Sequence, residues 1–94
     1  MNHEEIKEKL VSRQEAVRKD IVKQYIAYRK LRNLTQEDLA NLMGIKRPNI
    51  SRFETGEYNP TLDLLVKMAE SMNLEINIIL TNKAVEGSSD EKEQ

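Results

Sequence analysis

The chain has 94 residues, of which 38% are hydrophobic and 33% charged, so it is sized for one domain with a small core. Its formal net charge is −1, but residues 1–33 hold nine Lys and Arg against five Asp and Glu, so any contact with a polyanion has to come from a local face. The lack of cysteine and the single histidine, His3, exclude a disulfide framework, a thiolate nucleophile, a zinc finger and a histidine-centred triad built from one chain. No apolar run is long enough for a membrane helix and no signal-peptide pattern opens the chain, so we expect a cytoplasmic protein without metal or cofactor.

The first third of the chain has the pattern of a long helix. No glycine or proline precedes Gly44, and the apolar residues recur every three, four or seven positions. These apolar positions are Ile6, Leu10, Val17, Ile21, Tyr25, Tyr28 and Leu31. We expect one helix, or two merging helices, from about Glu4 to Arg32, with Asn33 as a left-handed stop. Its first half reaches beyond the small core, so residues 1–20 are expected to form a helical extension that packs on another chain or lies in solvent.

Two short helices are predicted next, at 36–43 and 47–55, on either side of a turn that starts with Gly44. Thr35 and Asp38 resemble a capping box at the start of the first helix. Its expected inner face consists of Leu39, Leu42 and Met43. Two short helices joined by a glycine-started turn are typical of a helix-turn-helix.

The second helix of this pair has two different faces. Ile50 and Phe53 point inward, and we expect Phe53 to lie in the core together with Tyr25 and Tyr28. The outward face and its flanks are small, polar and basic, and consist of Arg47, Pro48, Asn49, Ser51, Arg52 and Thr55. Such a face suits a helix that enters a DNA major groove, although an ordinary solvated face would have the same pattern.

A fourth helix is expected between Thr61 and Asn73, followed by a segment in which apolar and polar residues alternate. This alternation predicts a strand at 74–80, with Leu74, Ile76, Ile78 and Leu80 on its inner face. Because the sequence has no second strand pattern, we expect the strand to pair antiparallel with the same strand of another copy, through residues including Asn77. The alternatives are a short helix or an extended arm on the core. Residues 83–94 are small, polar and acidic, and we expect a disordered tail.

The stretch from Leu34 to Leu65 resembles the lambda-repressor/Cro type of helix-turn-helix domain, also called the XRE type. The shared positions are Leu34, Thr35, Gln36, Leu39, Ala40, Gly44, Ile45, Ile50, Glu54, Gly56, Pro60, Thr61, Leu62 and Leu65. The likeness covers about residues 21–80, with the helix-turn-helix motif at 36–55. It implies a mainly α domain of four to five helices, here with a long N-terminal helix and a C-terminal strand paired across a dimer.

The resemblance also implies roles for individual residues. The positions that match base-reading residues are Arg47, Pro48, Ser51 and Arg52, with Asn49 touching backbone or base. The positions that match phosphate contacts are Gln36 and Asn59. Arg29 and Glu54 match a family ion pair that ties the first helix to the recognition helix.

Two positions depart from the family pattern. Lys46 replaces the usual Ser or Thr, so the recognition helix loses a side-chain N-cap worth about 1 kcal/mol, and the lysine is placed to meet a phosphate instead. Arg47 replaces a frequent glutamine, which shifts the expected base preference from adenine toward guanine.

The long N-terminal helix and the C-terminal strand make the layout similar to HigA-type antitoxins. The resemblance implies a homodimeric, sequence-specific regulator of transcription, a repressor, that binds a palindromic operator in double-stranded DNA and is not an enzyme. One alternative is an antitoxin that binds a toxin protein and represses its own operon. A second alternative is an interaction adaptor that does not bind DNA.

Overall fold

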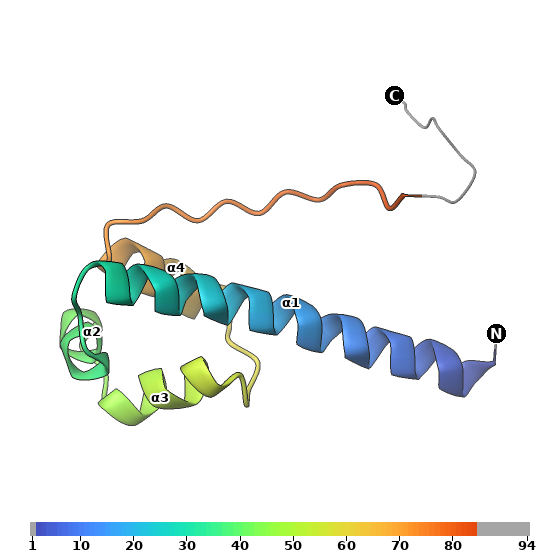
Figure 1. Ribbon diagram of the computed structural model, residues 1–94, viewed down its shortest axis with the longest axis horizontal. Helices are drawn as coiled ribbons and strands as arrows, with labels where there is room; N and C mark the ends of the chain where they lie inside the picture. Colours follow the sequence, from blue (N-terminus) through green and yellow to red (C-terminus); the bar gives the residue numbers. More distant parts are fainter. Residues whose placement is uncertain (1, 85–94) are drawn as a thin grey trace.

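The computed structural model describes residues 2–84, and four helices make up most of this part of the chain (Figure 1). They are α1 (His3–Leu31), α2 (Gln36–Met43), α3 (Arg47–Thr55) and α4 (Leu62–Ser71). The predicted mainly helical fold is confirmed, and the first third of the chain forms one helix, not two. Among the described residues, no helix combines the length and the apolar character that a membrane span requires.

α1 is capped at both ends by its own sequence. Asn2 is the N-cap, and its side chain accepts a hydrogen bond from the backbone N–H of Glu5 while the Glu5 carboxylate accepts one from the backbone N–H of Asn2. Asn33 follows the C-terminal end with φ of 57°, the left-handed geometry expected of a stop. The backbone N–H of Leu34 then donates to the carbonyl of Arg29 and closes the last turn.

α3 and α4 lie along the C-terminal half of α1, α2 packs on α3 and α4, and the N-terminal half of α1 projects beyond them (Figure 1). The largest fully buried side chains are Leu39, Ile50, Phe53 and Met68. Tyr25 of α1 contacts Phe53 edge to face, with ring centroids 5.4 Å apart. The core therefore lies at one end of the molecule, and the N-terminal half of α1 does not contact it.

Two residues that we expected on inner faces are exposed. Leu42 is 57% exposed because Leu39, Ala40 and Met43 form the buried arc of α2, and Leu42 lies outside that arc. Tyr28 is 42% exposed because α1 turns Tyr25 and Arg29 toward the core instead. The ring of Tyr28 lies beneath the guanidinium of Arg32, 5.3 Å from its centroid.

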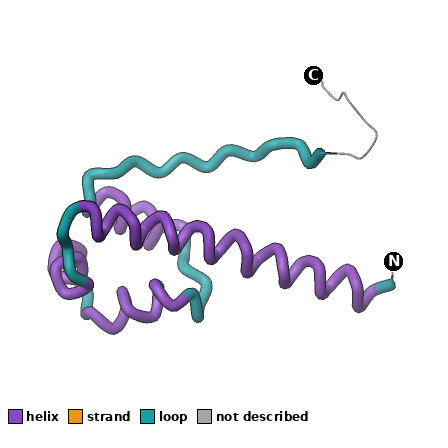
Figure 2. The backbone as a smooth tube through the Cα atoms, in the orientation of Figure 1, coloured by secondary structure: helices purple, strands orange, loops and turns teal. Residues whose placement is uncertain are grey.

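The predicted strand at 74–80 is not formed in the described chain. These residues are extended and run back along α1 as the long loop of Figure 2, but residues 2–84 contain no strand, because no described segment offers the backbone partners that a ladder needs. Leu74 and Ile76 are partly buried against the core, as the alternation predicts. Ile78 and Leu80, expected on the same face, are 65% and 93% exposed because the segment has left the core by then. Most of the predicted disordered tail at 83–94 lies outside the described residues.

Candidate nucleic-acid interface

The turn between α2 and α3 fixes how the two helices meet. Gly44 ends α2 with φ of 72°, a left-handed conformation that other residues adopt only with strain. The backbone N–H of Ile45 donates to the carbonyl of Ala40 at 3.0 Å. Ile50 and Phe53 bury the inner face of α3, so its opposite face is held toward solvent.

The N-terminal end of α3 is exposed and cationic. Lys46 is the N-cap residue, and its side chain makes no capping hydrogen bond. Lys46, Arg47 and Pro48 are all exposed. Because the first N–H groups of a helix lack intrahelical partners and carry partial positive charge, this end of α3 favours an anion.

The outward face of α3 continues with residues that are already paired with one another. Arg52 is exposed, and its Nη2 donates to Oδ1 of Asn49 at 2.7 Å. The hydroxyl of Thr55 donates to the carbonyl of Arg52 at 2.8 Å. Ser51, also on this face, is half-buried. The side chains are short apart from Arg52, so a duplex can approach the helix closely.

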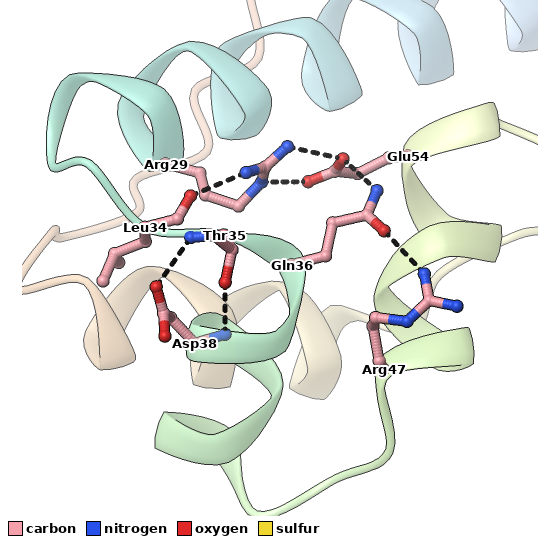
Figure 3. A network of polar contacts seen from close by, with 7 residues as sticks. All are labelled: Arg29, Leu34, Thr35, Gln36, Asp38, Arg47 and Glu54. Atoms are coloured by element: carbon pink, nitrogen blue, oxygen red, sulfur yellow. Dashed lines mark hydrogen bonds and ion pairs between the residues drawn. The ribbon is translucent and has the colours of Figure 1, made fainter.

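A chain of hydrogen bonds links α1 to the exposed end of α3 (Figure 3). Arg29 donates from Nε and Nη2 to the two carboxylate oxygens of Glu54, at 2.6 and 3.0 Å, and both side chains are nearly buried. Gln36 donates from Nε2 to Glu54 Oε1 at 2.9 Å and accepts from Nη1 of Arg47 at 3.1 Å. Arg29 also donates from Nη1 to the carbonyl of Leu34 at 2.7 Å. The position of the exposed Arg47 thus depends on a buried ion pair.

Asn59 lies near the other end of α3, in the loop before α4. Its Oδ1 accepts a hydrogen bond from Nη1 of Arg18 at 2.5 Å, and Nε of Arg18 donates to the carbonyl of Gly56 at 3.3 Å. Sequence reasoning gave Arg18 no role, because its partners lie 38 and 41 positions away. No local pattern signals a contact of that range.

The structure therefore brings Gln36, Lys46 and Arg47 together at the start of α3 and places Asn59 beyond its end. Nothing in the described part of the chain gathers three His, Cys, Asp or Glu side chains that could hold a metal ion.

Two short helices around a left-handed glycine, with the second exposing a cationic end, define a helix-turn-helix protein. The helix-turn-helix family profile matches residues 26–79, and the chain belongs to this family. The prediction of a helix-turn-helix protein is confirmed.

The chain is similar to several regulators. It is 46% identical over 52 residues to an uncharacterized HTH-type transcriptional regulator of Methanocaldococcus jannaschii, a match that covers 55% of this chain and 79% of the relative. An uncharacterized HTH-type transcriptional regulator of Haemophilus influenzae is 32% identical over 78 residues, covering 83% of this chain and 74% of the relative. The control protein C.SmaI of Serratia marcescens is 36% identical over 59 residues, covering 63% of this chain and 70% of the relative.

A solved structure, described as a toxin–antitoxin module from Streptococcus pneumoniae, is similar to the chain over most of its length. The TM-score is 0.59 at 27% identity, with 87% of this chain and 84% of that chain covered. The likeness extends beyond the helix-turn-helix itself to parts of the chain outside residues 26–79.

Proposed function

We propose that the chain is a sequence-specific regulator of transcription, a repressor, that places α3 in the major groove of double-stranded DNA. The observation that carries this proposal is the exposed cationic end of α3, held in position by hydrogen bonds that begin on α1. Membership of the helix-turn-helix family and the similarity to named transcriptional regulators support it.

Base reading falls to the outward face of α3. Arg47 and Arg52 each contact a guanine, because a guanidinium matches the two acceptors that guanine shows in the major groove. In the free protein Asn49 accepts a hydrogen bond from Arg52. On DNA, Asn49 contacts either a base edge or the sugar-phosphate backbone. Pro48 and Ser51 leave room for close approach and contact the bases directly.

Phosphate contacts flank that face. Lys46 meets a phosphate at the N-terminal end of α3, where the helix dipole adds to its charge. Asn59 meets a phosphate beyond the C-terminal end. Gln36 reaches a phosphate only if its amide gives up Arg47 or Glu54, since both bind it in the free protein.

The regulator acts as a homodimer on a palindromic operator, with the segment 74–80 of two copies paired antiparallel. Its extended backbone and its exposed Ile78 and Leu80 support this arrangement, because pairing supplies the missing backbone partners. Two recognition helices then meet half-sites about 34 Å apart. Asn77→Pro removes a backbone donor and is expected to weaken binding to a palindrome far more than binding to one half-site.

The experiment that tests the proposal is a selection of binding sites from random duplex DNA, followed by titration of variants on the selected site. Arg52→Ala is expected to cost about 1–3 kcal/mol on that site and much less on random DNA. The matched control, Lys67→Ala, removes a positive charge from α4 and leaves both affinities unchanged. Failure of the wild-type chain to bind any duplex would refute the proposal and favour an interaction adaptor.

A second candidate function is that of an antitoxin, which adds a toxin protein as partner to the same DNA binding. The similarity to a toxin–antitoxin module over 87% of the chain favours it. If the chain has this function, its co-expression relieves growth arrest caused by the product of the adjacent gene, and the two proteins co-purify. An adjacent product that neither arrests growth nor binds the chain would count against the candidate.

A further inference from the structure

α1 carries an apolar stripe that the core does not cover. We define the α1 stripe as Ile6, Leu10, Val17, Ile21, Tyr28 and Leu31. Ile21 is half-buried, and the other five are between 40% and 72% exposed. The stripe runs along the whole helix beside the face that Val22, Tyr25 and Arg29 turn toward the core.

The α1 stripe has nearly the same spacing when it is read from either end. Val17 and Ile21 flank its centre at equal distances, Leu10 matches Tyr28, and Ile6 matches Leu31 to within one residue. The polar residues that interrupt the stripe are placed symmetrically as well, because Gln14 and Gln24 are also equidistant from the centre. A helix with this symmetry presents apolar residues to apolar residues when a second copy lies antiparallel to it.

Two grooves that open on the α1 stripe have opposite charges. The acidic groove, about 530 Å³, lies between α1 and residues 74–79, and its charged lining residues are Asp20 and Glu75. The basic groove, about 420 Å³, lies between α1 and the loop before α4, and its charged lining residues are Arg13 and Arg18. Both grooves include Ile21, so they form one continuous surface.

We propose that the α1 stripe is an interface with a second copy of this chain, the two α1 helices packing antiparallel about an axis between Val17 and Ile21. In this register, residues 13–18 of one copy lie level with residues 20–25 of the other. The basic groove of each copy then faces the acidic groove of its partner. This charge complementarity and the symmetric spacing favour a second copy over an unrelated protein.

The inference rests on the homodimer of the proposed function and names a contact beyond strand pairing. Asp20 and Ile21 of α1 line the same groove as Asn77 of the extended segment. A two-fold axis at the centre of the α1 stripe therefore passes near the middle of residues 74–80. One two-fold axis can therefore relate both contacts, with the paired 74–80 segments lying over the paired α1 helices.

The first test is sedimentation equilibrium of the full chain at micromolar concentration. Leu10→Glu and Val17→Glu are each expected to raise the dimer dissociation constant by about a hundredfold or more, because each change enters a two-fold interface twice. Both sites lie outside the core, and unchanged thermal unfolding would verify the fold. The matched control, Ser12→Glu, places the same carboxylate on the opposite side of α1 and leaves the dissociation constant unchanged.

The second test fixes the register with cysteines, which the chain lacks. The double variant Leu10→Cys/Tyr28→Cys is expected to oxidise to a covalent dimer, because the two positions lie level across the axis. They are too far apart along one helix to form a bridge within one chain. Leu10→Cys alone should stay uncrosslinked, and a crosslink there would indicate parallel pairing and overturn the inference.

DNA binding separates failure of this inference from failure of the proposed function. Leu10→Glu is expected to bind a single half-site within twofold of wild type while it loses the dimer. A monomeric wild-type chain that binds its half-site would overturn the α1 interface and the homodimer, and would leave DNA binding through α3 standing. A dimer with the expected crosslinks that binds no duplex would support the interface and refute the proposed function.

Discussion

Arg29 and Glu54 lie 25 positions apart in the chain, yet both carboxylate oxygens of Glu54 accept hydrogen bonds from Arg29. The pair joins the last turns of α1 and α3, and water reaches little of either side chain. Glu54 also accepts a hydrogen bond from Gln36, and Gln36 accepts one from Arg47. The pair in the last turn of α3 therefore also influences Arg47 at the exposed N-terminal end of that helix.

Arg29→Ala and Glu54→Ala are each expected to destabilise the domain by about 3–5 kcal/mol, because each leaves an unpaired charge with little access to water. The double variant should cost less than the sum of the two single variants. Chemical denaturation of the four proteins measures this coupling. Strictly additive free energies of unfolding would show that the two side chains do not act as a unit.

Gln36→Ala is expected to weaken binding to the selected operator more than binding to random DNA. The reason is that Arg47 loses the amide oxygen that positions it, and a base contact depends on position more than a phosphate contact does. Titration on both kinds of duplex gives the two losses. Equal losses would indicate that Gln36 acts through phosphate alone.

Lys46→Thr is expected to stabilise the free protein by about 1 kcal/mol, since a threonine hydroxyl can cap α3 where the lysine side chain does not. The same change should weaken binding to all duplexes alike and reduce the dependence of affinity on salt, because one phosphate contact is lost. Thermal unfolding and binding at several salt concentrations test both parts. A variant that is more stable and binds with an unchanged salt dependence would remove Lys46 from the interface.

Asp38 links stability to acidic pH. The backbone N–H of Thr35 donates to Asp38 at 2.9 Å, and this hydrogen bond, with a second from the Thr35 side chain, lowers the pKa of the Asp38 carboxyl below its usual 3.8. Because the pKa of Asp38 is lower in the folded chain than in the unfolded chain, the ionised carboxylate stabilises the fold at pH values above the ordinary pKa. This stabilisation is lost as the pH falls through the lowered pKa. We expect Asp38→Asn to be less stable than wild type near neutral pH, with a difference that shrinks in acid. Thermal unfolding of both proteins from neutral to acidic pH measures this difference in stability. A difference that stays constant with pH would show that the charge of the Asp38 carboxylate does not contribute.

Tyr25 links stability to alkaline pH. Its hydroxyl donates to the carbonyl of Leu65 at 2.7 Å, and burial raises the pKa of the phenol above 10.0. The neutral phenol is favoured in the fold, so its contribution is complete below the ordinary pKa and is lost as the pH rises through the raised one. Tyr25→Phe should cost about 1 kcal/mol at neutral pH and make the loss of stability in alkali smaller. Unfolding of both proteins measured from neutral to alkaline pH tests this. If Tyr25→Phe loses stability in alkali as wild type does, groups other than Tyr25 cause that loss.

Local signals predicted the helices well, because their causes lie within a few residues. Thr35 caps α2 through its own side chain, as the spacing to Asp38 indicates. Gly44 ends the same helix in left-handed geometry, which follows from its lack of a side chain. On α1 the apolar spacing identified Tyr25 as a buried residue but not the buried face itself, because Val22 and Arg29 share that face while Tyr28 and Leu31 lie outside it.

The less predictable features depend on segments far apart in the chain. Apolar spacing could not tell Leu42 from Ala40, although only the small residue is buried where the helices meet. Similarly, the hydrogen bond between Gln36 and Arg47 requires the angle between α2 and α3. The strand predicted at 74–80 is not formed among the described residues of one chain, since a ladder needs a partner segment that these residues do not offer.

Arg18 of the N-terminal extension makes hydrogen bonds to the domain that follows it. α1 runs unbroken across the predicted boundary at residue 20, and Arg18 on its far side holds Gly56 and Asn59. A protein shortened to begin at Ile21 would keep every buried core residue but lose the side chain that braces the loop before α4. We expect such a fragment to fold but to carry Asn59 on a loop that Arg18 no longer holds, so a folded fragment would not by itself prove that the proposed phosphate contact of Asn59 is intact.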